Sequence, residues 1–292
     1  MRISTLIISS QPWSEAANTW GDVEAAGLDT AYVADHLTHP TMTGEWLADP
    51  WTTLAVAATV TTRIGLGTLV ASALIRSPVT LARQSSTLQD VSGGRFTLGV
   101  GAGAAADGIA DRGEETDARG RHTRLVHVVR GLHAVWAGEA GYASDAVSFS
   151  GLATAPLAPG SRRPRLVVAA HGNRGFELVA TSADGWSTYG GAQAVGATRE
   201  EFWEVVRRQG ADMDRACDGA SNDPRSISRS VLVGYAGYRP LASRASLEDE
   251  VAAAEACGLD ELVCYWPTEV SGGRFSSDPE VLAEVASKVN GS

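Results

Sequence analysis

Basic residues and cysteines are scarce in this sequence of 292 residues, and long hydrophobic stretches are missing. Lysine and arginine together number 24, against 34 aspartates and glutamates, so the formal net charge is −10. An acidic surface of this kind disfavours binding to nucleic acid or to anionic membranes. No apolar run reaches the ~18 residues that a transmembrane helix needs. We therefore expect a protein that binds neither nucleic acid nor membrane.

The three cysteines argue against a cysteine metal site, a C-x-x-C redox protein and a disulfide-stabilised fold. Cys217, Cys257 and Cys264 offer neither metal-site spacing nor a C-x-x-C redox pair, and three cysteines make no disulfide framework. We interpret them as ordinary free thiols. The first residues, MRISTLII, are typical of a β-strand, because they lack the basic segment and small-residue cleavage site of a signal peptide. We expect a cytoplasmic location.

Apolar segments rich in β-branched residues alternate along the chain with segments of helical period. The expected strands are Ile3–Ser9, Thr30–Ala34, Ile64–Ala71, Phe96–Gly101, Leu166–Ala170, Gly185–Tyr189, Ile227–Gly234 and Glu261–Tyr265. The expected helices are Ser14–Ala26, Pro50–Val60, Val79–Val91, Asp117–Trp136, Asn173–Ser182, Arg199–Cys217, Leu247–Cys257 and Pro279–Val289. Strict alternation implies parallel strands with right-handed crossovers.

Eight such units in a chain of this length predict an α/β fold, a closed (β/α)8 TIM-like barrel that forms a single domain over residues 1–292. An open Rossmann sheet is the competing architecture. The segment 138–164 breaks the alternation and is rich in glycine, serine, alanine and proline. We expect it to be an insertion before the fifth strand that holds a hairpin.

The stretch GGRFTLGVGAGAAADG contains Gly101-x-Gly103-x-x-Ala106, which matches the G-x-G-x-x-G/A pattern of a dinucleotide-binding turn. That turn normally follows a first strand, whereas this one follows a fourth, and no strand ending in an acid comes about 20 residues later. Two interpretations remain. The glycines allow close packing at a strand end, or Gly101, Ala102 and Gly103 form a bare floor for a planar ring at a barrel mouth.

Two further strand ends carry polar groups. YVADHLTHP places Asp35, His36 and His39 after the second strand, and together they could ligate zinc. Alternatively, His36 could act as a proton shuttle on a bound ligand. In the simplest interpretation, Asp35 is a buried acid paired with an arginine. His171, Gly172, Asn173, Arg174 and Gly175 lie between the fifth strand and its helix. The helix N-terminus and the arginine favour a phosphate, and an ordinary turn with an asparagine cap is the alternative.

Taken together, these segments resemble the bacterial luciferase-like superfamily of flavin- and deazaflavin-dependent oxidoreductases. The most specific part is RSPVTLARQSSTLQDVSGGRFTLGVGAG, from Arg76 to Gly103, which has Pro78, Gly94-Arg95 and Gly99-x-Gly101-x-Gly103 in the family's places. AYVADHLTHP, IGLGTLV and VVAAHGNRGFELVATSADGW also lie where the family has comparable segments. The resemblance covers nearly the whole chain.

The resemblance implies that FMN or coenzyme F420 binds at the carboxyl-terminal mouth of the barrel. It implies a non-prolyl cis peptide at Leu69–Val70 in a bulge of the third strand, and it places the catalytic candidate His36 beside the ring. The cofactor-binding residues would be Asp35, His36, Leu69, Val70, Ala71, Gly101, Ala102, Gly103, His171, Gly172, Asn173, Arg174 and Gly175. It also implies a small-molecule substrate, a homodimer, and a flavin or F420 reductase that supplies reduced cofactor.

The sequence departs from some relatives in ways that narrow the chemistry. Ala104 stands where F420-dependent sugar dehydrogenases of the superfamily have a proton-donating glutamate, and Pro40 stands where they have a tryptophan. No cysteine precedes Cys217, so the reactive cysteine of luciferases is absent. We therefore expect an F420-dependent oxidoreductase that is not a sugar dehydrogenase of that type. The alternatives are an FMN-dependent two-component monooxygenase, a metal-dependent barrel hydrolase and a non-catalytic cofactor-binding protein.

The loops at the mouth should set the substrate, because loops vary most on a shared barrel. These segments are Gln11–Trp13, Thr38–Trp46, Ala104–Thr123 and Gly190–Thr198. Trp13, Trp46 and Trp186 could line an apolar pocket, although tryptophan is also common in ordinary cores.

Overall fold

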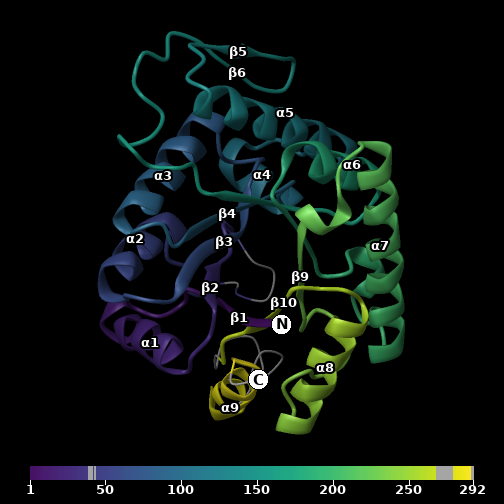
Figure 1. The fold of residues 1–292 in the computed structure, drawn as a ribbon. Helices are drawn as coiled ribbons and strands as arrows, with labels where there is room; N and C mark the ends of the chain where they lie inside the picture. The colour runs from purple at the N-terminus through teal and green to yellow at the C-terminus, as the bar shows by residue number, and fades with distance from the viewer. Residues whose placement is uncertain (39–41, 43, 268–278, 291–292) are drawn as a thin grey trace.

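A closed barrel of parallel strands forms the centre of the computed structural model, which describes residues 1–38, 42, 44–267 and 279–290 (Figure 1). Its strands are β1 (Arg2–Ile7), β2 (Thr30–Val33), β3 (Gly65–Ser72), β4 (Phe96–Gly101), β7 (Arg165–Ala169), β8 (Gly185–Thr188), β9 (Ser228–Leu232) and β10 (Glu261–Tyr265). Around the barrel the order is β1-β10-β9-β8-β7-β4-β3-β2. Because β1 pairs with both β2 and β10, the sheet has no open edge. The predicted barrel is confirmed, and the open Rossmann sheet is excluded.

Helices surround the barrel and begin close to the predicted positions (Figure 1). They are α1 (Trp13–Ala25), α2 (Pro50–Val60), α3 (Pro78–Val91), α4 (Ala105–Arg112), α5 (Ala118–Trp136), α6 (Asn173–Ser182), α7 (Arg199–Gly219), α8 (Arg244–Ala256) and α9 (Pro279–Asn290). Side-chain caps fix several starts: the Asp49 carboxylate accepts from the Thr52 N–H at α2. Helix α8 starts three residues before the apolar pattern indicated, because Ser243 caps it.

Two features interrupt the alternation. Helix α4 follows β4 directly and was not expected, because its eight residues AADGIADR are few for a helix and include a glycine. The predicted hairpin in 138–164 is present as β5 (Tyr142–Ala143) and β6 (Ser148–Phe149), outside the ring of helices beside α5 (Figure 1). A hydrogen bond of 2.8 Å between His127 Nδ1 and the Tyr142 hydroxyl joins the hairpin to α5.

Side chains close the amino-terminal end of the barrel. The buried Glu261 carboxylate accepts hydrogen bonds from Ser4 (2.5 Å) and Tyr32 (3.1 Å) and pairs with Arg2 (3.1 Å). Above this polar layer lies an apolar cluster inside the barrel, formed by Leu6, Tyr32, Leu69, Leu232, Val263 and Tyr265. Side chains therefore fill the barrel interior from its amino-terminal end, and space for a ligand remains at the carboxyl ends of the strands.

Candidate functional site

A cavity of about 960 Å³ lies at the carboxyl-terminal mouth of the barrel. Its lining includes twelve of the thirteen predicted cofactor-binding residues: Asp35, His36, Leu69, Val70, Gly101, Ala102, Gly103, His171, Gly172, Asn173, Arg174 and Gly175. Ala71 is different, because its side chain is fully buried in the apolar core and is not part of the lining. The topology thus gathers segments from β2 to the start of α6 around one space, as barrel enzymes do.

Asp35 is held as a buried acid paired with an arginine, one of the interpretations given by the sequence. Its Oδ1 accepts from Arg76 Nη2 at 2.8 Å, and its Oδ2 accepts from Arg76 Nε at 3.0 Å. The Ser72 N–H and the Trp51 indole also approach Oδ2, at 3.3 and 3.4 Å. With both oxygens engaged, this carboxylate ties the end of β2 to the segment after β3 and is a poor ligand for a metal.

His36 is held from behind by Asp107, a residue that the sequence analysis did not single out. His36 Nδ1 lies 2.8 Å from Asp107 Oδ2, and the N–H groups of Leu37 and Thr38 donate to Oδ1 at 2.9 and 3.1 Å. Burial alone would raise the pKa of Asp107, but these bonds hold it below its ordinary value. An ionised carboxylate only accepts, so His36 donates its Nδ1–H to Asp107.

The signal for Asp107 was weak in the sequence. It lies in the first turn of α4, three residues after Ala104, inside a run of alanines that resembles a loop. Its side chain is completely buried even though it is charged. A buried carboxylate needs partners, and only the fold brings α4 against the segment after β2.

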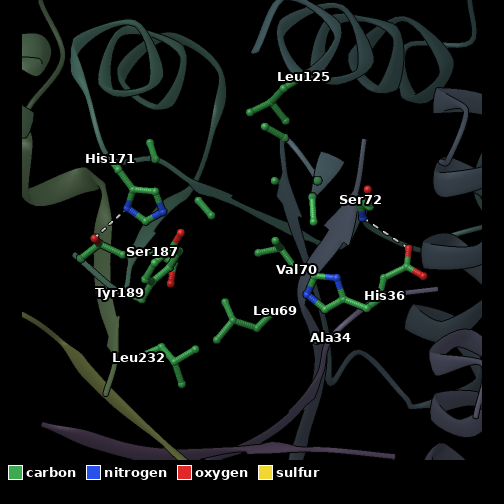
Figure 2. Close-up of a pocket in the computed structure, with 18 of the residues that line it drawn as sticks. Ala34, His36, Leu69, Val70, Ser72, Leu125, His171, Ser187, Tyr189 and Leu232 are labelled. Atoms are coloured by element: carbon green, nitrogen blue, oxygen red, sulfur yellow. Dashed lines mark hydrogen bonds between the residues drawn. The ribbon is translucent and has the colours of Figure 1, made fainter. Parts of the chain in front are cut away.

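The bulge expected in the third strand is present, with its cis peptide. The pairing of β3 with β4 shifts register between Thr68 and Ala71, and the bond Leu69–Val70 is cis. The Leu69 and Val70 side chains both line the cavity (Figure 2). The prediction drawn from the resemblance is therefore confirmed at this bond.

The glycines of β4 make room for this bulge. A Cβ on Gly101 would lie 2.5 Å from Val70 Cγ2. Gly103 has a φ of +81°, and a Cβ there would collide with the Ser72 hydroxyl. Close packing of two strands, the simpler of the two interpretations, thus explains Gly101, although the same backbone also borders the cavity.

The loop between β7 and α6 presents a helix N-terminus to the cavity. Gly172 occupies the N-cap position, and no side chain of the described residues caps α6, so the asparagine-cap alternative is wrong. Arg174 adds a positive charge, and Arg121 of α5 lines the same cavity. His122 beside them has a pKa lowered by burial and then by the charge of Arg174. Unpaired N–H groups at a helix start, together with guanidinium groups, favour an anion.

Aromatic rings that the sequence analysis missed cover the other side of the cavity. Tyr189 and Tyr235 have ring centroids 4.9 Å apart, and Tyr235 and Tyr265 6.1 Å. Burial, and secondarily Tyr235, raises the pKa of Tyr189, which keeps its phenol protonated. In the sequence, only the position of these three tyrosines pointed to the cavity, because each of them ends or directly follows a predicted strand. The predicted tryptophans do not contribute: Trp186 is buried against Phe176 in the core, and Trp13 and Trp46 are exposed and outside the lining.

Within the part of the chain that the structure describes, no three histidine, cysteine or acidic side chains are grouped as a metal site. His39 of the zinc hypothesis and Pro40 lie outside the described residues. No described helix is long and apolar enough to cross a membrane.

Known proteins resemble this chain in both sequence and fold. A protein of Mycobacterium tuberculosis without assigned function is 35% identical over 182 residues, which are 56% of this chain and 64% of the relative. The chain thus spans less than two thirds of that relative's length. The F420-dependent glucose-6-phosphate dehydrogenase of Beutenbergia cavernae is 29% identical over 281 residues, 89% of this chain and 79% of that enzyme.

Solved structures share the fold at lower identity. An F420-dependent secondary alcohol dehydrogenase in complex with an F420-acetone adduct matches with a TM-score of 0.78 at 16% identity, over 96% of this chain and 97% of the other. The family model described as luciferase-like monooxygenase matches residues 1–224, which carry the bulge of β3, the His36–Asp107 pair and the α6 N-terminus. The chain therefore belongs to the luciferase-like monooxygenase family.

Proposed function

We propose that this protein is an oxidoreductase that uses coenzyme F420 and transfers a hydride between C5 of the deazaflavin and a small organic substrate. The observation that carries the proposal is His36 on the wall of the cavity, held from behind by Asp107. Interconversion of an alcohol and a carbonyl moves a proton along with the hydride, so the site needs a group that exchanges protons. The F420-dependent relative from Beutenbergia cavernae, similar over most of the chain, supports the choice of cofactor.

The residues present suit a cofactor with a flat ring and an anionic tail. The Leu69–Val70 bulge would support the ring from behind, and the bare backbone of Gly101 to Gly103 would border it. The Ser72 hydroxyl is buried at the cavity and has no hydrogen-bond partner among the described residues, so it is available to a ring heteroatom. The α6 N-terminus with Arg174 would hold the phosphate.

Proton transfer would then fall to His36. When bound, the deazaflavin supplies the hydride acceptor or donor. Asp107 holds the imidazole through Nδ1–H, and we assign the uptake and return of the proton to the other ring nitrogen, Nε2. Ala104 offers no acid at the neighbouring position, and Asp107 acts only through His36. The tyrosine rings and the side chains of Leu69 and Val70 would exclude water from the reacting carbon.

A second candidate is an FMN-dependent monooxygenase of the two-component type. The family match over residues 1–224 favours it, because a two-component enzyme of this family would use the same barrel mouth with reduced flavin and oxygen. The phosphate of FMN suits the α6 N-terminus as well as that of F420. The two proposals differ in the cofactor and in the need for His36.

Titration of the purified protein with F420 and, separately, with FMN tests the choice between them through cofactor fluorescence. We expect F420 to bind and reduced F420 to be consumed with a carbonyl substrate. Tight binding of FMN without binding of F420 would refute the F420 proposal.

If a bound, reduced cofactor reacts with no member of a broad substrate panel, the protein is a non-catalytic carrier. Stoichiometric zinc, iron or manganese in protein purified without chelator would favour the hydrolase.

The variant His36→Ala tests the mechanism. We expect turnover to fall at least 100-fold, the usual contribution of a general acid or base, while cofactor affinity changes little. His127→Ala is the matched control, since His127 contacts Tyr142 in the hairpin, outside the cavity. Turnover that survives in His36→Ala would remove His36 from the mechanism.

A further inference from the structure

The wall opposite His36 carries a second histidine that the proposed mechanism does not use (Figure 2). His171 follows β7, and its Nδ1 lies 3.1 Å from the Thr188 hydroxyl at the end of β8. The edge of its ring meets Tyr189, with ring centroids 4.4 Å apart. A Cβ on Gly191 would lie only 3.0 Å from the His171 Cβ, so a larger residue at that position would press against His171. These contacts fix the orientation of the imidazole.

The hydrogen bonds behind Thr188 determine which group donates. Gln209 of α7 is buried, and its amide nitrogen lies 3.1 Å from the carbonyl oxygen of Gly190 and 3.5 Å from that of His171. Carbonyl oxygens only accept, so this end of Gln209 is the NH2 group, and its other end is Oε1. Oε1 lies 2.6 Å from the Thr188 hydroxyl and also only accepts. Thr188 therefore donates its single proton to Gln209.

It follows that Thr188 accepts from His171. The Gly190 N–H already donates to the Thr188 oxygen at 2.9 Å, and the second lone pair of that oxygen receives the His171 Nδ1–H. Burial lowers the pKa of His171 to about 4, so the ring is neutral near pH 7. A neutral imidazole with a proton on Nδ1 has a lone pair on Nε2. Figure 2 shows this second ring nitrogen of His171 on the cavity side, away from the dashed hydrogen bond.

We propose that His171 Nε2 is a hydrogen-bond acceptor for a hydroxyl group of the bound ligand, and that Thr188 and Gln209 are positioning residues that fix its tautomer. The hydroxyl belongs either to the substrate or to the ribityl chain that F420 and FMN share. The inference rests on the proposed function in one respect, namely that the cavity holds these ligands.

This role separates His171 from the phosphate site, which the resemblance places at Gly172 to Gly175. A lone pair repels phosphate oxygens, so the phosphate would bind to the N–H groups at the start of α6 and to Arg174 instead. The two histidines would then divide the work: His36 exchanges the proton, and His171 orients a hydroxyl without taking part in transfer.

Nitrogen-15 NMR of histidine-labelled protein tests the tautomer without any ligand. We expect His171 to carry its proton on Nδ1 in the wild type and to lose this preference in Thr188→Val, which removes the hydroxyl and keeps the shape. Thr188→Ser should restore the preference. Thr181→Val, on the outer side of α6, is the control for loss of a threonine hydroxyl. A proton on Nε2 of wild-type His171 would overturn the inference whether or not the protein binds F420.

Ligand additions then identify the source of the hydroxyl. If it is the ribityl chain, F420 or FMN shifts the His171 Nε2 signal upfield, and His171→Phe weakens cofactor binding about tenfold. If it belongs to the substrate, the cofactor leaves the signal in place, 2-propanol added to the cofactor complex shifts it, and His171→Phe raises KM about tenfold with unchanged cofactor affinity. No shift with any of these ligands, together with unchanged affinity and KM in His171→Phe, would refute the hydroxyl contact.

Discussion

At the scale of single residues, buried polar side chains without sequence signals control the two histidines of the cavity. Asp107 holds His36, and Thr188 with Gln209 holds His171. Each of these three side chains is buried and fully engaged in hydrogen bonds. A buried polar group without a partner is costly, so the same contacts that satisfy the buried groups also fix the orientation of the imidazoles.

The substitution Asp107→Asn should separate the geometry of the His36 contact from its charge. The amide oxygen can still accept from Leu37 and Thr38, so its NH2 group would face His36 Nδ1 and force the proton onto Nε2. We expect turnover to fall by about 10²–10⁴-fold, as when the acid behind a catalytic histidine is neutralised, with little change in cofactor affinity. Steady-state kinetics with nitrogen-15 NMR of His36 measures both effects. Wild-type turnover in this variant would show that Asp107 is only structural.

The neutral state of His171 should make the protein less stable in acid. Burial lowers its pKa from 6.5 to about 4, so between these values the unfolded chain binds a proton that the folded chain does not. The free energy of unfolding should therefore fall as the pH drops below 6.5, by up to about 3 kcal/mol near pH 4. Urea unfolding at pH 7 and pH 4.5 should show a smaller fall for His171→Gln. His127→Gln should keep the full wild-type fall, and equal falls in all three proteins would contradict the prediction.

At the scale of elements, the pairing of β3 with β4 shapes the wall of the cavity. The bulge between Thr68 and Ala71 turns the Leu69 and Val70 side chains toward the ligand space, and Gly101 of β4 lets the bulge approach. Helix α4 follows directly and brings Asp107 to His36. A change in this strand pair should therefore affect stability and cofactor binding together.

The substitution Gly101→Ala should displace Val70, because the new Cβ would lie 2.5 Å from Val70 Cγ2. Overpacking of this kind costs about 1–3 kcal/mol, and we expect a lower Tm and weaker cofactor binding. Gly21→Ala in α1 is the control, since nothing lies within 4 Å of its added Cβ, and alanine should stabilise the helix by up to about 1 kcal/mol. Unchanged cofactor affinity in Gly101→Ala would show that the bulge tolerates displacement.

At the scale of the whole molecule, the closed barrel makes every strand depend on both neighbours. The pairing of β1 with β10 joins the first strand of the chain to the last. The polar group around Glu261 and the apolar cluster above it fill the interior between opposite strands. These shared contacts support our proposal that residues 1–292 form a single domain.

Unfolding should accordingly be one cooperative transition. We expect thermal curves from far-UV circular dichroism and from tryptophan fluorescence to coincide, and added F420 to raise the Tm in proportion to its affinity. Two separated transitions would indicate two independent units.

Sedimentation at several protein concentrations would test the homodimer that the resemblance implies, and a monomer at all concentrations would exclude it.

The sequence by itself determined the barrel, because alternating apolar periods of strand and helix leave few other ways to bury both faces of eight parallel strands. The resemblance to the luciferase-like superfamily, which rests on motifs in a fixed order along the chain, also implied the cis bond at Leu69–Val70 and most of the cavity lining. Only the tertiary structure brought Asp107 of α4 to His36 and Thr188 of β8 to His171, since these partners lie on different elements and their spacing carries no periodic signal. Hydrogen-bond direction depends on every neighbour of a buried group, and those neighbours become known only when the chain is folded.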